Sequence, residues 1–191
     1  EEARKELGLS GFVVVSAFGS QGAKVMNETI ADMMPLEQAD GFPFHHIHAT
    51  GSFGKEWMPK RVMDNGVDWK NCPALDLREY IYDMPTVMAA ADIVIGRAGS
   101  ATCNEIGASG TPCILIPSPN VTNARVLEAA GGAVVVLERD CTPEKLYELV
   151  RSLLADENRR REMSRKLHAM VRLDSAERIC DIVEQLASDQ R

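Results

Sequence analysis

The sequence lacks the features that mark membrane, secreted or nucleic-acid-binding proteins. No apolar run reaches the roughly 18–20 residues that span a bilayer, and the charged N-terminus is unlike a signal peptide. The five cysteines are odd in number and without C-x-x-C spacing, which argues against a disulfide framework and a zinc site. Lys and Arg number 21 against 28 Asp and Glu, and the net charge of −7 disfavours nucleic acid as the main partner. These features predict a cytoplasmic protein with reduced thiols.

The composition is that of a globular protein, with 45% apolar and 26% charged residues among 191, enough to bury one substantial core. We expect a linker or the remnant of an interdomain segment at 1–10, one domain at 11–173 and a C-terminal helix at 174–191. One predicted helix carries a run of basic residues: Arg159, Arg160, Arg161, Arg165 and Lys166. We interpret this run as a solvated helix face, with a phosphate or anionic-lipid site as the alternative.

Short apolar segments alternate with helical ones along most of the chain. We expect strands at 12–16, 44–49, 75–80, 93–95, 113–116 and 133–137. We expect helices at 23–33, 55–64, 84–90, 103–108, 124–130, 143–154, 157–171 and 175–187. This alternation predicts an α/β fold, a Rossmann-like, doubly wound parallel sheet of about six strands with both faces covered. Ligands of such folds bind at the carboxyl ends of the strands, so the turns that follow the strands form the candidate site.

The segment from Ala91 to Glu105 is the most informative one. An apolar strand is followed by a small-residue turn with one cation, Arg97, and by a helix that begins near Ser100 or Ala101. A helix N-terminus after such a turn directs unpaired N–H groups and the positive end of the helix dipole at one point, a geometry that binds phosphate. Glu105, about one turn further, is suited to accept hydrogen bonds from a pair of ribose hydroxyls. An ordinary βα unit with a Ser cap and a solvated glutamate is the alternative.

A second glycine turn follows the first expected strand. Gly19 and Gly22 permit close approach of the backbone to an anion, and Ser20 adds a hydroxyl. The spacing differs from the G-x-G-x-x-G of dinucleotide enzymes, and their acidic residue about 20 positions on at a strand end is missing. The sequence therefore disfavours NAD as the ligand, while both glycine turns are expected at the same edge of the sheet.

Two further motifs have competing interpretations. The tract His45-His46-Ile47-His48 looks like a metal site, but His46 and His48 share one strand face, His45 points away and no third ligand has a convincing spacing. We expect no metal there, and His48 has an alternative place in the ligand cleft.

The segment at 80–84 also has two interpretations. Backbone groups beside Ile81 can form hydrogen bonds with the edge of a flat base, or the segment is a plain turn with Asp83 as N-cap. No Ser/His/Asp or Cys/His nucleophilic set stands out.

Together these segments resemble the C-terminal, donor-binding half of the MurG family, GT-B glycosyltransferases of family 28. The resemblance runs from about Leu7 to Leu186. It is carried by Gly19-Ser20-Gln21-Gly22-Ala23, Tyr80-Ile81-Tyr82-Asp83-Met84, Arg97-Ala98-Gly99-Ser100-Ala101-Thr102 with Glu105, Pro112 to Pro117 and the helix start Asn123-Ala124. It implies one half of a GT-B fold and a hexosyltransferase that moves N-acetylglucosamine from UDP-GlcNAc onto lipid I, making lipid II for peptidoglycan.

The resemblance also implies residue roles. Ser20 and the turn from Gly99 to Thr102 would hold the diphosphate beside Arg97, Ile81 would meet uracil through its main chain, and Glu105 would bind the ribose. UDP then leaves from the anomeric carbon without a metal or a cofactor, because N–H groups, helix dipole and arginine stabilise its charge. The implied substrate-binding residues are Gly19, Ser20, Ile81, Arg97, Gly99, Ser100, Ala101, Thr102, Glu105 and Asn123.

Three departures separate this chain from the family pattern. Phe18 stands where the family's loop has its first glycine, so its side chain either crowds the phosphates or changes the path of the loop. The family's sugar-gripping glutamines before the helix at 124–130 are missing, since Thr122 leads directly to Asn123. Either the loop was deleted or the sequence lacks a disordered stretch at this point. The acceptor-binding N-terminal half, with the expected catalytic base and membrane-contacting patch, is absent.

The resemblance therefore predicts a domain, at 11–173, that binds UDP-GlcNAc but does not transfer sugar alone. The absent half would bring an undecaprenyl-linked acceptor and would place the full enzyme peripherally on the cytoplasmic face of the cell membrane; nucleic acid is not expected as a partner. Three alternatives stay open: the donor half of another UDP-sugar glycolipid synthase, one half of a two-subunit GlcNAc transferase with a membrane-bound partner, and a non-catalytic nucleotide-binding module.

Overall fold

Six parallel strands form the centre of the structure, a computed structural model that describes residues 2–171 and 174–188. They are β1 (Val13–Ala17), β2 (His45–Ala49), β3 (Leu75–Arg78), β4 (Ile93–Gly96), β5 (Cys113–Leu115) and β6 (Ala133–Val135). Their order in the sheet is β3-β2-β1-β4-β5-β6, and every neighbouring pair is parallel. The predicted Rossmann-like, doubly wound sheet is confirmed.

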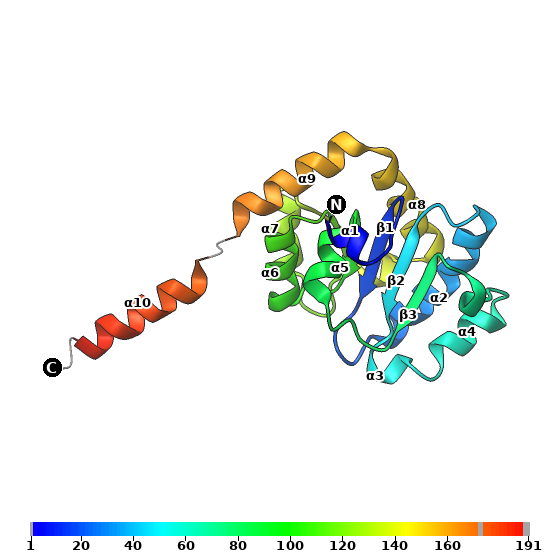
Figure 1. Ribbon diagram of the computed structural model, residues 1–191, viewed down its shortest axis with the longest axis horizontal. Helices are drawn as coiled ribbons and strands as arrows, with labels where there is room; N and C mark the ends of the chain where they lie inside the picture. The colour runs from blue at the N-terminus through cyan, green and yellow to red at the C-terminus, as the bar shows by residue number, and fades with distance from the viewer. Residues whose placement is uncertain (1, 172–173, 189–191) are drawn as a thin grey trace.

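Helices cover both faces of this sheet (Figure 1). One face packs against α2 (Lys24–Ala39), α4 (Met58–Asp64) and α8 (Pro143–Ala155). The other packs against α5 (Met84–Ala90), α6 (Ser100–Ser109) and α7 (Thr122–Ala129). The remaining described elements are α1 (Glu2–Glu6) beside α5, α3 (Gly51–Gly54), α9 (Glu157–Met170) against α6 and α8, α10 (Ser175–Ser188), and the 3-10 turns η1 (Trp69–Asn71) and η2 (Glu138–Asp140).

The central strands are buried on both sides, which explains why they read as continuous apolar runs. Val13, Val14 and Val15 are each fully buried, and they alternate between the two core layers. Val14 packs in the layer under α2 and α8, whereas its two neighbours pack in the layer under α5 and α6. Full burial of a side chain of this size stabilises the fold by about 1.5–3 kcal/mol.

Helix α2 continues to Ala39, beyond the predicted end at 33, with Pro35 inside it. Proline has no N–H, so the carbonyl of Ala31, four residues earlier, loses its helical hydrogen bond. The side-chain amide of Asn65, at the end of α4, donates to that carbonyl at 3.1 Å. A donor from a neighbouring helix therefore replaces the missing bond, and the helix passes through its proline.

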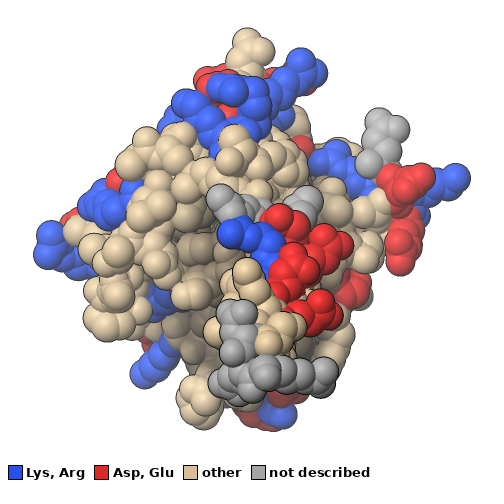
Figure 2. Space-filling view, turned by 90° about the vertical axis from the view of Figure 1, so that its left-hand side faces the viewer, with Lys and Arg blue, Asp and Glu red and all other residues tan. Residues whose placement is uncertain are grey.

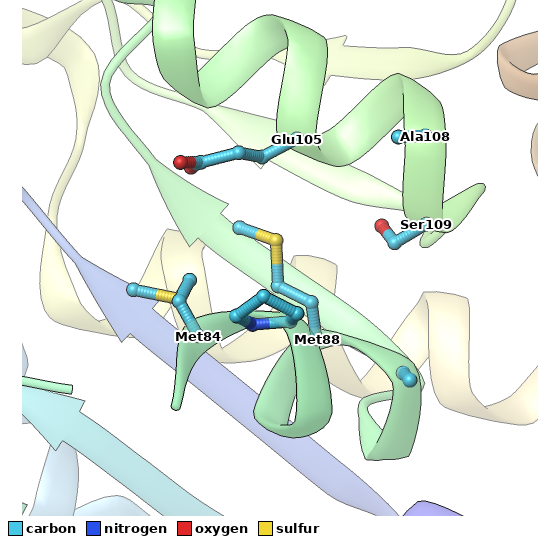
Figure 3. Close-up of a pocket in the computed structure, with 7 residues that line it drawn as sticks. Met84, Met88, Glu105, Ala108 and Ser109 are labelled. Atoms are coloured by element: carbon cyan, nitrogen blue, oxygen red, sulfur yellow. The ribbon is translucent and has the colours of Figure 1, made fainter. Parts of the chain in front are cut away.

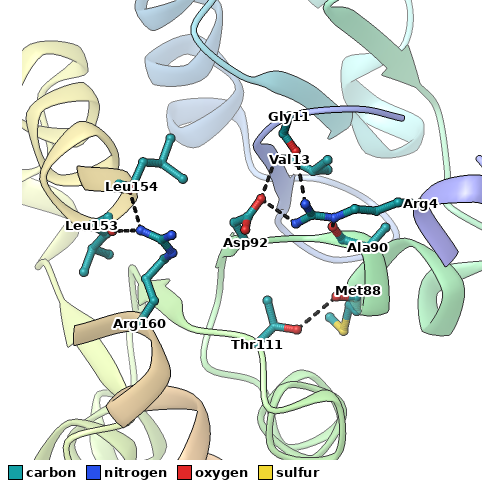
Figure 4. Close-up of polar contacts among 10 residues, drawn as sticks. All are labelled: Arg4, Gly11, Val13, Met88, Ala90, Asp92, Thr111, Leu153, Leu154 and Arg160. Carbon is teal, nitrogen blue, oxygen red and sulfur yellow. Dashed lines mark hydrogen bonds and ion pairs between the residues drawn. The ribbon is translucent and has the colours of Figure 1, made fainter. Parts of the chain in front are cut away.

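The basic run on α9 is only partly the solvated face that the sequence predicted. Figure 2 shows Lys and Arg gathered at the top of the molecule, over α9. Arg160, however, donates from Nη1 to the carbonyl oxygens of Leu153, at 2.6 Å, and Leu154 at the end of α8 (Figure 4). Its guanidinium also lies 5.2 Å from the ring centroid of Phe12. This arginine therefore caps a helix inside the fold.

The last described helix, α10, extends away from the rest of the structure (Figure 1). None of its residues is buried, and one apolar face is exposed: Ile179, Ile182, Val183 and Leu186. Among residues 2–171 and 174–188, no helix combines the length and apolar character needed to cross a bilayer.

Candidate functional site

The point where the chain reverses its direction across the sheet lies between the neighbouring strands β1 and β4. Connections from β1 lead toward β2 and β3, and those from β4 lead toward β5 and β6. The two glycine turns, at 18–23 and 97–99, follow these strands at the same carboxyl edge, as the sequence predicted. In open α/β sheets this is the position at which ligands bind.

A cavity of about 290 Å³ opens at this point. Strands β1, β2 and β4 contribute its floor, and α5 and α6 contribute its walls. Its lining residues are Val15, Ala17, Gly19, Ser20, Ala49, Tyr80, Ile81, Met84, Met88, Val94, Ala101, Thr102 and Glu105. Of the ten predicted substrate-binding residues, this set contains Gly19, Ser20, Ile81, Ala101, Thr102 and Glu105.

A second, mainly apolar cavity of about 300 Å³ adjoins the first and shares Met84, Met88 and Glu105 with it. Figure 3 shows both methionine side chains between α5 and α6, beneath the Glu105 carboxylate. The sequence analysis missed these methionines. They are four residues apart on the helix that follows the third predicted strand, so both lie on one helix face. This spacing could have identified them from the sequence.

The N-terminus of α6 is uncapped. Gly99 occupies the N-cap position in extended conformation, and no side chain accepts a hydrogen bond from the first turn. The N–H groups of Ser100, Ala101 and Thr102 have no acceptor among the described residues. The predicted alternative of a Ser cap is therefore wrong, and donors of the kind that bind an anion stand free at the cavity.

Glu105 and Ile81 present polar groups from opposite walls. Glu105 is exposed on α6, one turn beyond the free N–H groups, and forms no ion pair among the described residues. Ile81 as a whole residue is 2% exposed and lines the cavity, and its backbone N–H and carbonyl make no hydrogen bond within the described chain. Asp83, at the N-cap position of α5, accepts a hydrogen bond from Arg78 at 3.2 Å and does not cap the helix with its side chain.

Phe18 does not crowd the glycine turn. The first of the two alternatives given for this residue, crowding of the phosphates, is therefore wrong. Its ring is 4% exposed and packs in the core layer under α2. It lies at 6.2 Å, centroid to centroid, from the imidazole of His48. The turn that follows is left open, with Gly19 and Ser20 exposed at the cavity.

The alternative that places His48 in the ligand cleft is wrong, because His48 does not line the cavity. His48 is fully buried, and its Nδ1 lies 2.6 Å from Ser16 Oγ. The same hydroxyl lies 2.8 Å from His46 Nε2, and His46 Nδ1 lies 2.8 Å from Glu37 Oε1. Burial, followed by the nearby His46, lowers the pKa of His48 well below its usual value, so this imidazole is neutral. The histidines thus form a buried polar chain with Ser16 and Glu37, outside the cavity.

Arg97 and Asn123 stand at the same edge but do not line the cavity. The Arg97 guanidinium donates to the carbonyl of Ile116 at 3.0 Å and to Glu138 Oε2 in η2. Asn123 Nδ2 donates to the carbonyl of Ala98 at 3.1 Å, which ties α7 to the glycine turn. Glu138 was not predicted as a site residue. It lies in the 3-10 turn after β6, and nothing in the residue pattern indicates that this turn brings it to Arg97.

The thiols near the site are poor nucleophiles. Burial raises the pKa of Cys103, and burial raises the pKa of Cys141 to about 11. Among the described residues, no group of three or more His, Cys, Asp or Glu side chains is arranged to hold a metal ion.

Comparisons with known proteins agree with this geometry. A family model described as the glycosyltransferase family 28 C-terminal domain matches residues 12–183. The chain belongs to this family.

Two curated relatives of the family 28 domain have the same description, UDP-N-acetylglucosamine--N-acetylmuramyl-(pentapeptide) pyrophosphoryl-undecaprenol N-acetylglucosamine transferase. The one from Acetivibrio thermocellus is 36% identical over 198 residues, covering 100% of this chain and 52% of the relative. The one from Caldanaerobacter subterraneus subsp. tengcongensis is 36% identical, covering 97% of this chain and 52% of the relative. The chain thus spans about half the length of the curated relatives it matches.

Solved structures share the fold of this family 28 domain. Acinetobacter baumannii MurG matches with a TM-score of 0.77 and 24% identity, over 96% of this chain and 52% of that one. The S. aureus MnaA–UDP co-structure matches with a TM-score of 0.73 and 12% identity, over 98% and 49%. The predicted architecture, one half of a GT-B glycosyltransferase, is confirmed.

Proposed function

We propose that this family 28 domain binds UDP-N-acetylglucosamine in the cavity between β1 and β4 and serves as the donor half of a hexosyltransferase. The observation that carries the proposal is the uncapped N-terminus of α6, whose free N–H groups stand at the same cavity as the Gly19–Ser20 turn. Backbone donors and a helix dipole at one place favour a phosphate group.

The remaining groups of the cavity suit the other parts of the donor. Glu105 is placed to accept hydrogen bonds from two ribose hydroxyls, and charge-assisted bonds of this kind contribute about 1.5–3 kcal/mol each. The unpaired backbone groups of Ile81 offer one donor and one acceptor to the edge of uracil. Met84 and Met88 supply adaptable apolar surface beside the base.

In the proposed reaction an acceptor hydroxyl attacks the anomeric carbon of the donor, and UDP leaves with negative charge on its terminal phosphate. The free N–H groups and the dipole of α6, together with Arg97, stabilise that charge. The names of the relatives support an undecaprenyl-linked acceptor and a product of the lipid II type. We place the acceptor site, the catalytic base and any membrane contact in the half of the relatives that this chain does not span.

Calorimetric titration of this chain with UDP-GlcNAc, UDP, ADP and NAD, without added divalent metal, tests the donor assignment. Selective binding of the two uridine nucleotides is the expected result. Equal affinity for ADP, or no nucleotide binding by a folded protein, would overturn it. Crowding by Phe18 no longer accounts for a failure to bind, because that ring is buried.

A second candidate, a nucleotide-binding domain without transferase activity, is favoured by the short connection between β5 and α7. Only residues 116–121 separate the two elements, so few side chains remain there to contact a sugar. In the same titration, UDP-GlcNAc that binds no differently from UDP would favour this candidate. A gain from the sugar would favour the transferase.

A further inference from the structure

Arg97 and Glu138 form the least exposed ion pair among the described residues at the carboxyl edge of the sheet. Their side chains are 21% and 30% exposed, whereas those of Arg78 and Asp76 are 28% and 47% exposed. The second bond of Arg97, to the Ile116 carbonyl, fixes the guanidinium from β5. Because partial burial weakens screening by solvent, this pair couples more strongly than its neighbours at the edge.

The pair lies on the opposite side of the sheet from the cavity. Along β4, Val94 packs under α5 and α6 and lines the cavity, while Ile95 packs under α2 and α8. Arg97 and its partner Glu138, in η2 shortly before α8, both act electrostatically on the Cys141 thiol, which packs in the same core layer as Ile95. Both terminal nitrogens of Arg97 already have a partner, the Ile116 carbonyl and Glu138, so an anion at the N-terminus of α6 has to compete with these partners for the guanidinium.

Two other cations near this edge are also paired, at the end of α3 and at the end of β3. Lys55 contacts Glu79 at 3.2 Å, and Arg78 contacts Asp76 at 2.7 Å. An anion at the N-terminus of α6 therefore meets free backbone N–H groups, while Arg97, Lys55 and Arg78 are each already paired with a carboxylate.

We propose that Glu138 is the counter-ion of Arg97 before a ligand binds and that a diphosphate displaces it, so that Glu138 sets the preference of the site for a diphosphate over a monophosphate. The inference rests on the proposed function. A ligand must compensate for the broken ion pair. A diphosphate reaches Arg97 with its second phosphate, whereas a monophosphate held by the N–H groups alone leaves the pair intact.

Glu138→Gln tests the proposal because the amide keeps the size of the side chain and one acceptor oxygen but removes the charge. We expect UDP and inorganic pyrophosphate to bind this variant about tenfold more tightly than the wild type, while the affinity for UMP changes less than about twofold. Asp140→Asn is the matched control, since it removes the same charge from the same 3-10 turn without touching Arg97. We expect this variant to bind UDP, pyrophosphate and UMP with affinities within about twofold of those of the wild type.

A double-mutant cycle identifies Arg97 as the group through which Glu138 acts. In an Arg97→Gln background, Glu138→Gln has no effect on pyrophosphate affinity if the proposal holds. Weaker diphosphate binding by Glu138→Gln would instead make Glu138 an anchor for Arg97 and overturn the proposal. The proposal would also be overturned if Asp140→Asn raised the pyrophosphate affinity equally, or if the gain from Glu138→Gln persisted in the Arg97→Gln background. A wild-type protein that does not bind pyrophosphate at all would overturn it too. Tighter pyrophosphate binding without any uridine-selective binding would leave this inference standing and defeat the proposed function.

Discussion

Gly22 and Gly51 meet backbone to backbone, which joins the loops after β1 and β2 into one unit. A Cβ on Gly51 would lie 2.1 Å from the amide nitrogen of Gly22, and one on Gly22 would lie 2.2 Å from the carbonyl oxygen of Thr50. The amide of Ser52 also donates to the carbonyl of Ser20 at 3.1 Å. The position of the Gly19–Ser20 turn therefore depends on a glycine in a neighbouring loop.

Gly51→Ala should separate these loops. The new methyl group clashes with backbone atoms of the Gly19–Gly22 turn, which must shift to make space for it. We therefore expect a loss of about 3 kcal/mol or more in unfolding free energy and weaker UDP binding. Urea denaturation and calorimetry measure the two effects. Gly66→Ala is the control, because Gly66 has φ +83° but no atom within 4 Å of the added Cβ. It should cost only about 1–2 kcal/mol of backbone strain; equal losses at both sites would contradict the close contact.

Phe18→Ala should destabilise the fold without improving nucleotide binding. Removal of this buried ring leaves a cavity beneath α2, with an expected loss of about 3–5 kcal/mol in unfolding free energy. Phe53→Ala, at a side chain 70% exposed, should change stability by less than about 0.5 kcal/mol. Tighter UDP binding by a folded Phe18→Ala protein would indicate that the ring does crowd the site.

Glu105→Ala should weaken UDP binding by roughly 1–3 kcal/mol, because the ribose hydroxyls lose a charged acceptor. Calorimetry on UDP and on pyrophosphate separates the two parts of the ligand, since only UDP carries a ribose. Glu144→Ala, in the first turn of α8, is the control for a loss of net charge. Unchanged UDP affinity would remove Glu105 from the proposed site.

The stability of the protein should fall as pH drops below about 6.5. The unfolded state binds a proton at His48 near this pH, but burial lowers the pKa of the folded imidazole, so the native state does not take the proton. The unfolding free energy then decreases by up to about 1.4 kcal/mol for each pH unit until the folded pKa is reached. Urea denaturation at pH 7.5, 6.5 and 5.5 should show a flatter dependence for His48→Gln than for the wild type. Parallel curves would exclude His48 as the source.

Arg160→Ala should cost about 1–3 kcal/mol in unfolding free energy, whereas the adjacent Arg159→Ala should cost less than about 0.5 kcal/mol. Arg160 bonds to the last carbonyls of α8 and covers Phe12, while Arg159 is exposed on the solvent side of α9. Thermal unfolding of the two single variants makes the comparison. Similar midpoints would mean that the whole basic run is a solvated face.

The sheet and most helices were predictable because the periodicity of apolar residues, and the Gly and Pro residues that bound each element, are local signals. Each of the six strands lies at one of the expected ranges, although β2 is rich in histidine and β3 alternates between apolar and charged residues. Helix α5 has the expected bounds of 84–90. The end of α2 was not predictable, because the donor that satisfies Ala31 comes from Asn65, far along the chain. Short-range patterns carry no information about such a replacement.

The site was predictable only as far as turns and strand order define it. Gly19, Ser20 and Glu105 line the cavity because parallel strands bring their turns to one edge. The partners of Arg97 and the inward direction of Phe18 depend on which side of the sheet a side chain leaves after the strand has ended. The alternation of a strand no longer fixes that direction in a loop.

The buried chain of Glu37, His46, Ser16 and His48 also fixes the register of the sheet. Valines alone would tolerate a shift of β1 against β2, since both core layers accept apolar side chains. Ser16 pairs directly with His48 in the ladder, and its hydroxyl also serves His46. A slip by one residue would turn Ser16 to the opposite layer and leave two imidazoles without their shared partner. The polar chain therefore allows one alignment of the two strands, and with it one placement of the loops that follow them.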